Sequence, residues 1–263
     1  MAVIVELLRQ LEKTWSATDE NSALSACNRG EDVLDAAQRA LLARAEELRQ
    51  ITDGAFDPQI GSLVALWGFY DDQYRVPQEQ EIRQAQQQLR WDLGAVIKGY
   101  AGDLAVEILE RYDVDRAILN LGGNIQTYGE KAQGESWNVG IQNPAGGEPM
   151  GVLAVEGTMA VVTSGDYQRY FENEGKRYHH ILDPKTGMPA ESGLRAVTVI
   201  CTDGMLADAL STALFVMGLE KAADHWQEHG NYEAVFLLAD GRIFATSGAV
   251  LTGCEYEVIE DEN

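Results

Sequence analysis

The stretch 194-LRAVTVICTDGMLADALSTALFVMG-218 decides the fold class. Its first part, Leu194–Cys201, is rich in β-branched and apolar residues and predicts a strand. The part that follows, Met205–Met217, is so apolar that it predicts a largely buried helix. A strand and a buried helix in one stretch indicate a chain that mixes both kinds of element.

The rest of the chain adds helices and strands in no regular order. Apolar residues at helical spacing predict further helices. These helices are expected at Glu6–Trp15, Asp32–Gln50, Glu79–Gln88, Gly99–Tyr112 and Lys221–His229. Strand patterns fall at Arg116–Leu121, in an antiparallel meander over Trp137–Val162, and in a closing hairpin of Ala234–Leu238 and Arg242–Thr246. We therefore expect an α+β fold, with mixed or antiparallel sheets and flanking helices. No linker or repeat divides the chain, which predicts a single domain over residues 1–263.

The charge balance of the chain argues against polyanionic partners. The chain has 20 Lys and Arg against 42 Asp and Glu, a formal net charge of −22. Such a field repels nucleic acid and anionic lipid, so neither is expected as a partner. Much of the acid lies in stretches such as Glu255–Asn263, which we interpret as solvated surface. An anionic ligand would need a local cation or metal ion to offset this field.

The lengths of the apolar runs and the spacing of the cysteines further narrow the possible classes of protein. No apolar run approaches the roughly 18 residues that a membrane span requires, and Met1–Gln10 lacks the features of a signal peptide. The three cysteines, Cys27, Cys201 and Cys254, are far apart and fit neither zinc spacing nor a complete disulfide framework.

Asp208 and Thr212 are the clearest chemical signal in the sequence. They lie four residues apart in the buried helix, so a carboxylate and a hydroxyl project from one face into the interior. A buried carboxylate is costly unless a cation or hydrogen-bond donors compensate it, and oxygen ligands of this kind suit Mg²⁺. The alternative is that Asp208 only accepts hydrogen bonds from neighbouring backbone.

The stretch 91-WDLGAVIKGYA-101 predicts an anion site. A short strand runs through a glycine into the start of a helix that carries Lys98. Exposed amides at a helix N-terminus together with an ammonium group suit a phosphate or pyrophosphate. The Walker spacing is absent, and an ordinary surface lysine remains the alternative.

Three further segments combine glycine turns with polar residues. In 178-YHHILDPKTG-187, adjacent histidines in a strand point to opposite faces, so only one of them can face a pocket. In 52-TDGAFDP-58, two carboxylates flank a glycine turn, and local capping explains them equally well. The stretch 117-AILNLGGNI-125 ends a strand in two glycines, where a backbone can approach a ligand closely, or where the chain simply makes a hairpin turn.

Eight motifs in this order resemble the ApbE family of FAD:protein FMN transferases, over about Leu7 to Ser247. They are TDGAFDP, WGF, DLGAVIKGYA, NLGGNI, WNVGIQNP, TSGDYQRYF, YHHILDPKTG and ADALSTALFVMG. The resemblance implies an α+β architecture related to the T-fold, here without the strand that usually opens the family's sequences. It also implies cleavage of FAD, release of AMP and linkage of FMN to a Thr or Ser of a partner, commonly a subunit of a membrane redox complex. A periplasmic or inner-membrane-associated location follows from the same resemblance, with a cytoplasmic one as the alternative.

The resemblance also assigns roles to residues. It puts the magnesium site on the carboxylate of Asp208, the hydroxyl of Thr212 and the backbone carbonyl of Ala95. The residues expected to contact FAD are Gly54, Ala55, Phe56, Asp92, Lys98 and Ile181. His180 is the expected base for the acceptor hydroxyl, and Asp183 is expected to orient that strand or its histidine. Two alternatives remain: hydrolysis of FAD to FMN and AMP, and a flavin-binding protein without turnover.

Overall fold

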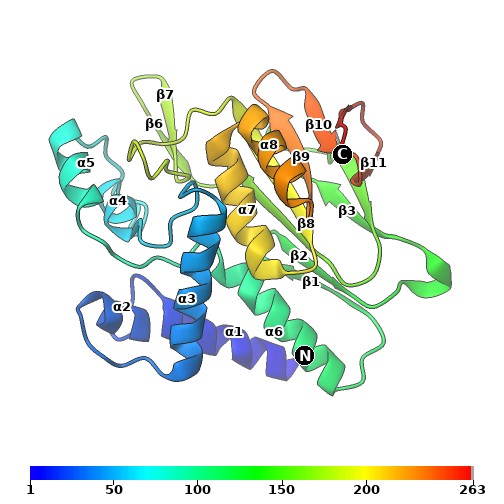
Figure 1. Ribbon diagram of the computed structural model, residues 1–263, viewed down its shortest axis with the longest axis horizontal. Helices are drawn as coiled ribbons and strands as arrows, with labels where there is room; N and C mark the ends of the chain where they lie inside the picture. Colours follow the sequence, from blue (N-terminus) through cyan, green and yellow to red (C-terminus); the bar gives the residue numbers. More distant parts are fainter. Residues whose placement is uncertain (262–263) are drawn as a thin grey trace.

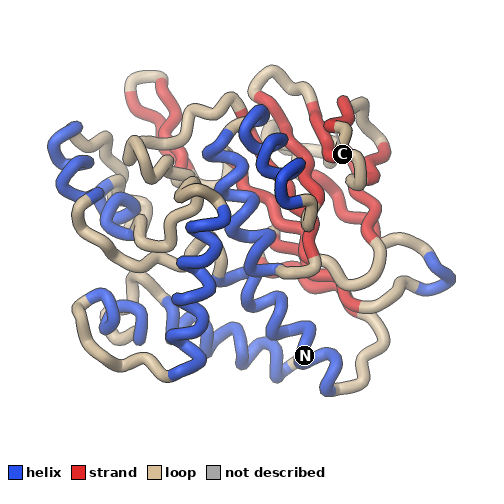
Figure 2. The backbone as a smooth tube through the Cα atoms, in the orientation of Figure 1, coloured by secondary structure: helices blue, strands red, loops and turns tan. Residues whose placement is uncertain are grey.

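The computed structural model describes residues 1–261. Its helices are α1 (Ala2–Trp15), α2 (Ala23–Asn28), α3 (Ala36–Ile51), α4 (Gly61–Leu66), α5 (Glu79–Gln86), α6 (Ile97–Arg111), the short 3₁₀ turn Ala132–Gly134, α7 (Gly204–Met217) and α8 (Leu219–His229). Its strands are β1 (Ala117–Leu121), β2 (Asn124–Tyr128), β3 (Trp137–Ile141), β4 (Gly151–Val155), β5 (Ala160–Gly165), β6 (Tyr170–Asn173), β7 (Lys176–His179), β8 (Leu194–Cys201), β9 (Glu233–Leu238), β10 (Ile243–Thr246), β11 (Val250–Thr252) and β12 (Glu257–Ile259). Figures 1 and 2 show these elements as a ribbon and as a tube.

A seven-stranded sheet forms the centre of the fold, in the order β1-β2-β5-β8-β9-β10-β12. Neighbouring strands are antiparallel except β10 and β12, which are parallel, so the sheet is mixed. A three-stranded sheet has the order β11-β4-β3, and β6 and β7 form a separate hairpin. This arrangement confirms the α+β class that the sequence predicts.

The large sheet is covered on both faces. Helices α6 and α7 pack against one face, with α8 beside α7 (Figure 1). The apolar side chains of the three-stranded sheet share a core with the other face. In β8, Val197 and Val199 belong to the core under the helices, whereas Ala196 and Ile200 belong to the core between the sheets. This central strand is therefore apolar on both faces, which explains its nearly unbroken hydrophobic sequence.

Two glycines let α6 and α7 cross at very short range. A Cβ atom on Gly99 would lie 1.9 Å from the carbonyl oxygen of Gly204, so a larger residue cannot occupy that position without moving the helices. At the crossing each helix supplies a carboxylate that caps the other. Asp208 of α7 accepts a hydrogen bond from the Gly99 amide at 2.9 Å, and Asp103 of α6 accepts from the amides of Gly204 and Met205 at 2.7 and 2.9 Å. Unpaired amides at helix starts need such acceptors, so the two helices stabilise one another.

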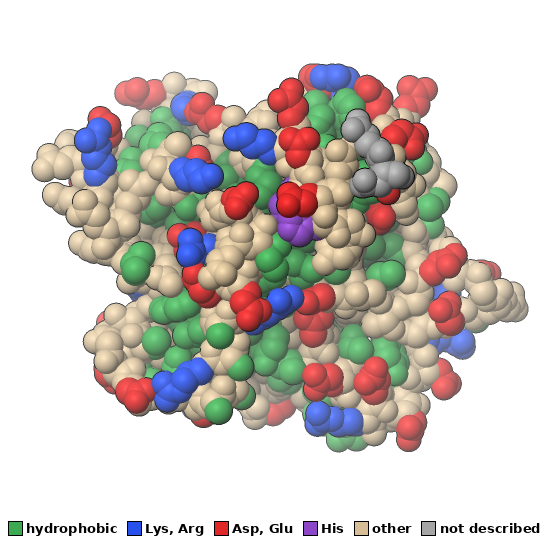
Figure 3. Space-filling view, viewed as in Figure 1, with side chains coloured by type: hydrophobic (Ala, Val, Ile, Leu, Met, Phe, Trp, Pro, Cys, Tyr) green, Lys and Arg blue, Asp and Glu red, His purple; other side chains and the backbone are tan. Residues whose placement is uncertain are grey.

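Charged side chains cover much of the protein surface, as the acidic composition predicts. Figure 3 shows Asp and Glu side chains spread over the visible face, with Lys and Arg side chains among them. Within residues 1–261, no helix is both long and apolar enough to cross a membrane. The acidic stretch Glu255–Asn263 has mostly exposed side chains, and its last two residues lie outside the described part of the chain.

The meander predicted over Trp137–Val162 is partly wrong. Strands β3 and β4 do pair antiparallel, but β5 lies in the seven-stranded sheet between β2 and β8. Alternating apolar residues show that a strand has a buried face, and they do not say which sheet it joins. The closing hairpin of β9 and β10 is confirmed. Helix α6 begins at Ile97, two residues before the predicted start, so that Lys98 lies in its first turn.

Candidate functional site

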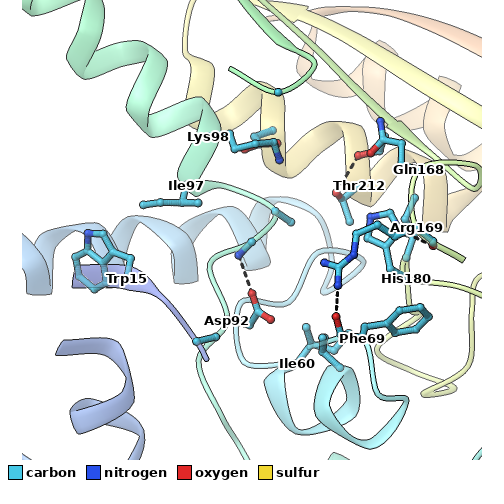
Figure 4. A pocket seen from close by; sticks show the side chains of 18 of the residues that line it. Trp15, Ile60, Phe69, Asp92, Ile97, Lys98, Gln168, Arg169, His180 and Thr212 are labelled. Atoms are coloured by element: carbon cyan, nitrogen blue, oxygen red, sulfur yellow. Dashed lines mark hydrogen bonds and ion pairs between the residues drawn. The ribbon is translucent and has the colours of Figure 1, made fainter. Parts of the chain in front are cut away.

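A cavity of about 840 Å³ lies between the N-terminal helices, the start of α6, and α7. This volume is within the range of small-molecule sites. Most of the predicted site residues line it, namely Ala55, Phe56, Asp92, Ala95, Lys98, His180, Ile181, Asp208 and Thr212. Figure 4 shows how several of them surround the opening. Gly54 and Asp183 are the predicted residues that do not line the cavity.

Asp208 is buried, with 3% of its surface exposed, and is compensated from two directions. One carboxylate oxygen accepts from the Gly99 amide, and the other lies 3.7 Å from Nζ of Lys98. The sequence also allows Asp208 to accept hydrogen bonds only from neighbouring backbone. The backbone group that it binds belongs instead to another helix, 109 residues away. The residues that the sequence linked to metal and phosphate binding are therefore in direct contact.

Asp208, Thr212 and Ala95 line the same cavity and offer it oxygen atoms of the kind that a hard cation binds. Thr212 Oγ1 lies 3.2 Å from Ser164 Oγ, which lies 2.8 Å from Ser211 Oγ. The Ala95 carbonyl accepts no hydrogen bond from any group in residues 1–261, so its lone pairs are available. A carboxylate, a hydroxyl and a carbonyl are the donors that Mg²⁺ prefers. No cluster of three or more His, Cys, Asp or Glu side chains suited to a metal occurs in the described chain, so a cation here depends on the neutral oxygens as well.

Asp92 is held rigidly where the chain enters α6. One of its oxygens accepts from the Gly94 amide at 2.7 Å, and the other accepts from the Tyr70 hydroxyl at 2.6 Å. Burial, and then the charge of Asp92, raise the pKa of Tyr70, so that its hydroxyl stays protonated and continues to donate. The carboxylate is thus fixed by two donors on the cavity wall.

The turn that contains Gly54 ends helix α3. Gly54 has a φ of 72° and its amide donates to the carbonyl of Arg49, which closes the helix. This residue positions the next two, Ala55 and Phe56, which do reach the cavity. Its contribution to a ligand site is therefore through backbone geometry.

The two adjacent histidines face opposite ways, as the strand pattern predicts. His179 is buried in the core, where Nε2 lies 3.1 Å from the Ala190 carbonyl and the ring packs edge-on against Phe215. His180 lines the cavity, and its Nδ1 lies 3.2 Å from the Arg169 carbonyl. A carbonyl only accepts, so Nδ1 carries the hydrogen and Nε2 carries the lone pair. Burial lowers the pKa of His180 to about 4, so the ring is neutral at pH 7.

Asp183 supports a turn rather than the imidazole. Its Oδ1 accepts from the Lys185 amide at 2.8 Å, and its own amide donates to Met188. Among the described residues it forms no hydrogen bond with His180, and a role toward that histidine stays a prediction. Ile181 is buried, and its carbonyl accepts from the Ala190 amide.

Sequence reasoning did not assign roles to Gln168 and Arg169. Both line the cavity from the connection between β5 and β6. Gln168 donates to the Thr163 carbonyl at 3.1 Å, and the Arg169 guanidinium donates to the Phe69 carbonyl. Both belong to the motif TSGDYQRYF, which by itself assigns them no function. An arginine among aromatic residues in an acidic chain is the signal that was available.

Known proteins share both the sequence and the fold. A FAD:protein FMN transferase from Treponema pallidum is 36% identical over 287 residues, covering 94% of this chain and 79% of that protein. One from Klebsiella pneumoniae is 35% identical over 230 residues, covering 79% of this chain and 71% of that protein. The crystal structure of an ApbE protein from Thermotoga maritima matches with a TM-score of 0.85 at 33% identity, covering 92% of this chain and 87% of that chain.

Fold, cavity and relatives together place the protein among the transferases. The profile of the ApbE family matches residues 1–236, which reach from α1 into β9. The chain belongs to the ApbE family.

Proposed function

We propose that this protein transfers FMN from FAD to a Thr or Ser hydroxyl of an acceptor protein, with release of AMP and with dependence on Mg²⁺. The observation that supports the proposal is that one cavity is lined by the imidazole of His180, a helix start that carries Lys98, and a set of carboxylate, hydroxyl and carbonyl oxygens. These are the parts that phosphoryl transfer requires: a base, a site for the pyrophosphate and a site for a cation.

The start of α6 is suited to the pyrophosphate of FAD. Lys98 lies in the first turn, where the helix dipole favours negative charge. Its side chain is 41% exposed, so it can leave Asp208 and reach a ligand. In a chain with a net charge of −22, this ammonium group provides the local attraction that an anionic substrate needs.

Asp208, Thr212 and the carbonyl of Ala95 would hold the magnesium ion. When bound, the ion neutralises charge on the pyrophosphate oxygens. Ser164 lies between Thr212 and Ser211 and fixes the direction of the Thr212 hydroxyl. The carboxylate is already fixed by the Gly99 amide, so these ligands need little rearrangement.

His180 accepts the proton of the acceptor. The acceptor oxygen attacks the phosphorus of the FMN phosphate, and a new P–O bond forms. The bond from that phosphorus to the bridging oxygen breaks, and the bridging oxygen leaves with AMP. The hydroxyl proton passes to Nε2 of His180, which the Arg169 carbonyl keeps in the required tautomer.

The decisive experiment uses mass spectrometry of an acceptor after incubation with FAD and Mg²⁺. The resemblance points to an acceptor segment with an Asp-Gly-x-Thr-like context. A mass gain of FMN less water on that threonine is the expected result. Free FMN and AMP with an unmodified acceptor would identify a hydrolase, and FAD binding without any product would identify a carrier.

The location of the reaction is a separate proposal. The family resemblance supports a periplasmic or inner-membrane-associated site of action, where redox complexes with covalent flavin would be the acceptors. Fractionation of the native host, with detection of this chain by antibody, tests the location. Recovery from the cytoplasmic fraction alone would contradict it.

A further inference from the structure

Arg169 is a cation on the cavity wall to which the proposed reaction gives no contact with the substrate. Its guanidinium donates to the Phe69 carbonyl, and this is the one hydrogen bond that the side chain forms within residues 1–261. A guanidinium has five N–H donors. The donors that remain are available to a ligand in the cavity that Arg169 lines.

The charges on the cavity wall make this arginine distinctive. Four carboxylates and two cations line the cavity: Glu12, Asp57, Asp92, Asp208, Lys98 and Arg169. Lys98 is paired with Asp208. Arg169 has no carboxylate within ion-pair distance in the described chain. Arg169 is an exposed residue, and an unpaired cation on the wall of an open cavity attracts an anionic ligand.

Arg169 is also the residue that holds the base. Its carbonyl accepts from the backbone amide of His180 at 3.0 Å and from the imidazole Nδ1 at 3.2 Å. Figure 4 shows the guanidinium beside the imidazole, with Lys98 on a different wall. The side chain of Arg169 therefore lies on the side of the cavity from which the base acts.

We propose that Arg169 binds the phosphate of the FMN half of FAD, the group that is transferred, and stabilises the charge on its oxygens during attack. The inference rests on the proposed function. The base must lie next to the attacking oxygen, and that oxygen must lie next to this phosphorus. The cation beside the base is therefore the one nearest the transferred phosphate, whereas Lys98 is nearer the metal ligands. Arg169 stays protonated, and its planar fork suits two phosphate oxygens.

Riboflavin and FMN provide the test, because they differ only by this phosphate. The dissociation constants of both are measured by flavin fluorescence with metal-free protein, so that no turnover is involved. The wild type is expected to prefer FMN. Arg169→Met is expected to reduce that preference about tenfold or more, by loss of charge-assisted hydrogen bonds, with little change for riboflavin. Arg169→Lys keeps the charge and is expected to retain part of the preference.

Arg90→Met is the matched control. Arg90 donates to the Ala17 carbonyl at 2.8 Å, much as Arg169 donates to Phe69, but Arg90 does not line the cavity. Loss of this hydrogen bond to a backbone carbonyl is expected to leave the ratio of FMN to riboflavin affinity unchanged. An unchanged ratio in Arg169→Met, or a wild type without preference for FMN, would overturn the inference. A wild type that modifies no acceptor would instead overturn the proposed function, whatever the binding ratios are.

Discussion

The two walls of the cavity are built in different ways. The helical wall, made of Lys98, Asp208 and Thr212, is set by the crossing of α6 and α7, where two glycines pack closely and each helix caps the other with a carboxylate. In the loop wall, the side chains of Arg169 and His180 each form one hydrogen bond to a backbone carbonyl. Residues of the helical wall therefore have a part in folding besides their proposed chemistry, whereas for residues of the loop wall the proposed chemistry is the main role.

This difference leads to distinct expectations for mutations. A change that removes a capping group from the helical wall should alter stability and activity together, because the same group caps a helix and lines the cavity. A change in the loop wall should alter rate or affinity while the protein stays folded. Variants of the two walls, and of the helix crossing that supports them, test that separation.

Gly99→Ala should have the largest effect. The added Cβ would meet the Gly204 carbonyl oxygen at 1.9 Å, and that oxygen is backbone and cannot turn away. We expect a loss of more than about 3 kcal/mol in the free energy of unfolding, measured by urea denaturation. Gly30→Ala is the control, because its Cβ would have open space and only its φ of 84° would cause strain of about 1 kcal/mol. Equal losses in the two variants would contradict the tight crossing.

His180→Asn should slow transfer by about 10²–10⁴-fold and leave FAD affinity nearly unchanged, because a base lowers the barrier without anchoring the ligand. Single-turnover transfer to an acceptor peptide gives the rate, and calorimetry gives the affinity. His179→Asn, at the last residue of β7 and next to His180, is the control. It should cost stability instead, because His179 is buried against Phe215.

The dependence of the transfer rate on pH also tests the role of His180 as the base. His180 can act only when neutral, and burial lowers its pKa to about 4. The transfer rate should therefore stay level as the pH falls through 6.5 and decline only near pH 4. A decline centred near pH 6.5 would mean that the imidazole is solvated or is not the base.

Asp208→Asn should reduce Mg²⁺-dependent transfer about 10²–10³-fold, the usual cost of one lost electrostatic group in a site. The amide oxygen can still accept from Gly99, so most stability should remain. Asp208→Ala lacks that acceptor and leaves Lys98 without its partner, and we expect it to cost about 1–3 kcal/mol in unfolding experiments. Thr212→Val should have a milder effect on transfer. A normal rate for Asp208→Asn in Mg²⁺ would contradict the metal assignment.

Asp103→Asn should change how stability depends on pH. Burial raises the pKa of Asp103 from 3.8 to about 6, so between these values the folded chain binds a proton that the unfolded chain releases. The wild type should therefore lose stability from this group as the pH rises toward 6, by about 1–3 kcal/mol. The variant should lack this slope in denaturation experiments from pH 4 to 7. Equal slopes would show that Asp103 is hydrated.

The difference between the helical wall and the loop wall also explains which site residues could be predicted from the sequence. Residues of the helical wall follow a local pattern: Asp208 and Thr212 are four apart in a helix, and Lys98 follows a glycine at a helix start. The facing of His179 and His180 follows from strand alternation. The contact between Lys98 and Asp208, and the Gly99–Gly204 crossing, join segments about 100 residues apart and have no local signal.

The loop wall was less accessible to sequence reasoning. The place of Arg169 depends on a carbonyl of Phe69, 100 residues earlier, and on the path of a loop between two sheets. The placement of β5 failed for a related reason, because alternation does not name the partner strand. Asp183 and Gly54 were identified as site residues by resemblance, and the structure gives both of them roles in turns.

The mutual capping of α6 and α7 has a consequence for hydrogen exchange. The amides of Gly99, Gly204 and Met205 are each protected by a carboxylate on the opposite helix. Exposing any one of them to solvent breaks a hydrogen bond that joins α6 to α7, so local opening of either helix start loosens the crossing. These amides should therefore exchange with one common opening free energy, as a single cooperative unit. A bound cation on Asp208 would then slow exchange at Gly204 and Met205, on the far side of the crossing, as much as at Gly99.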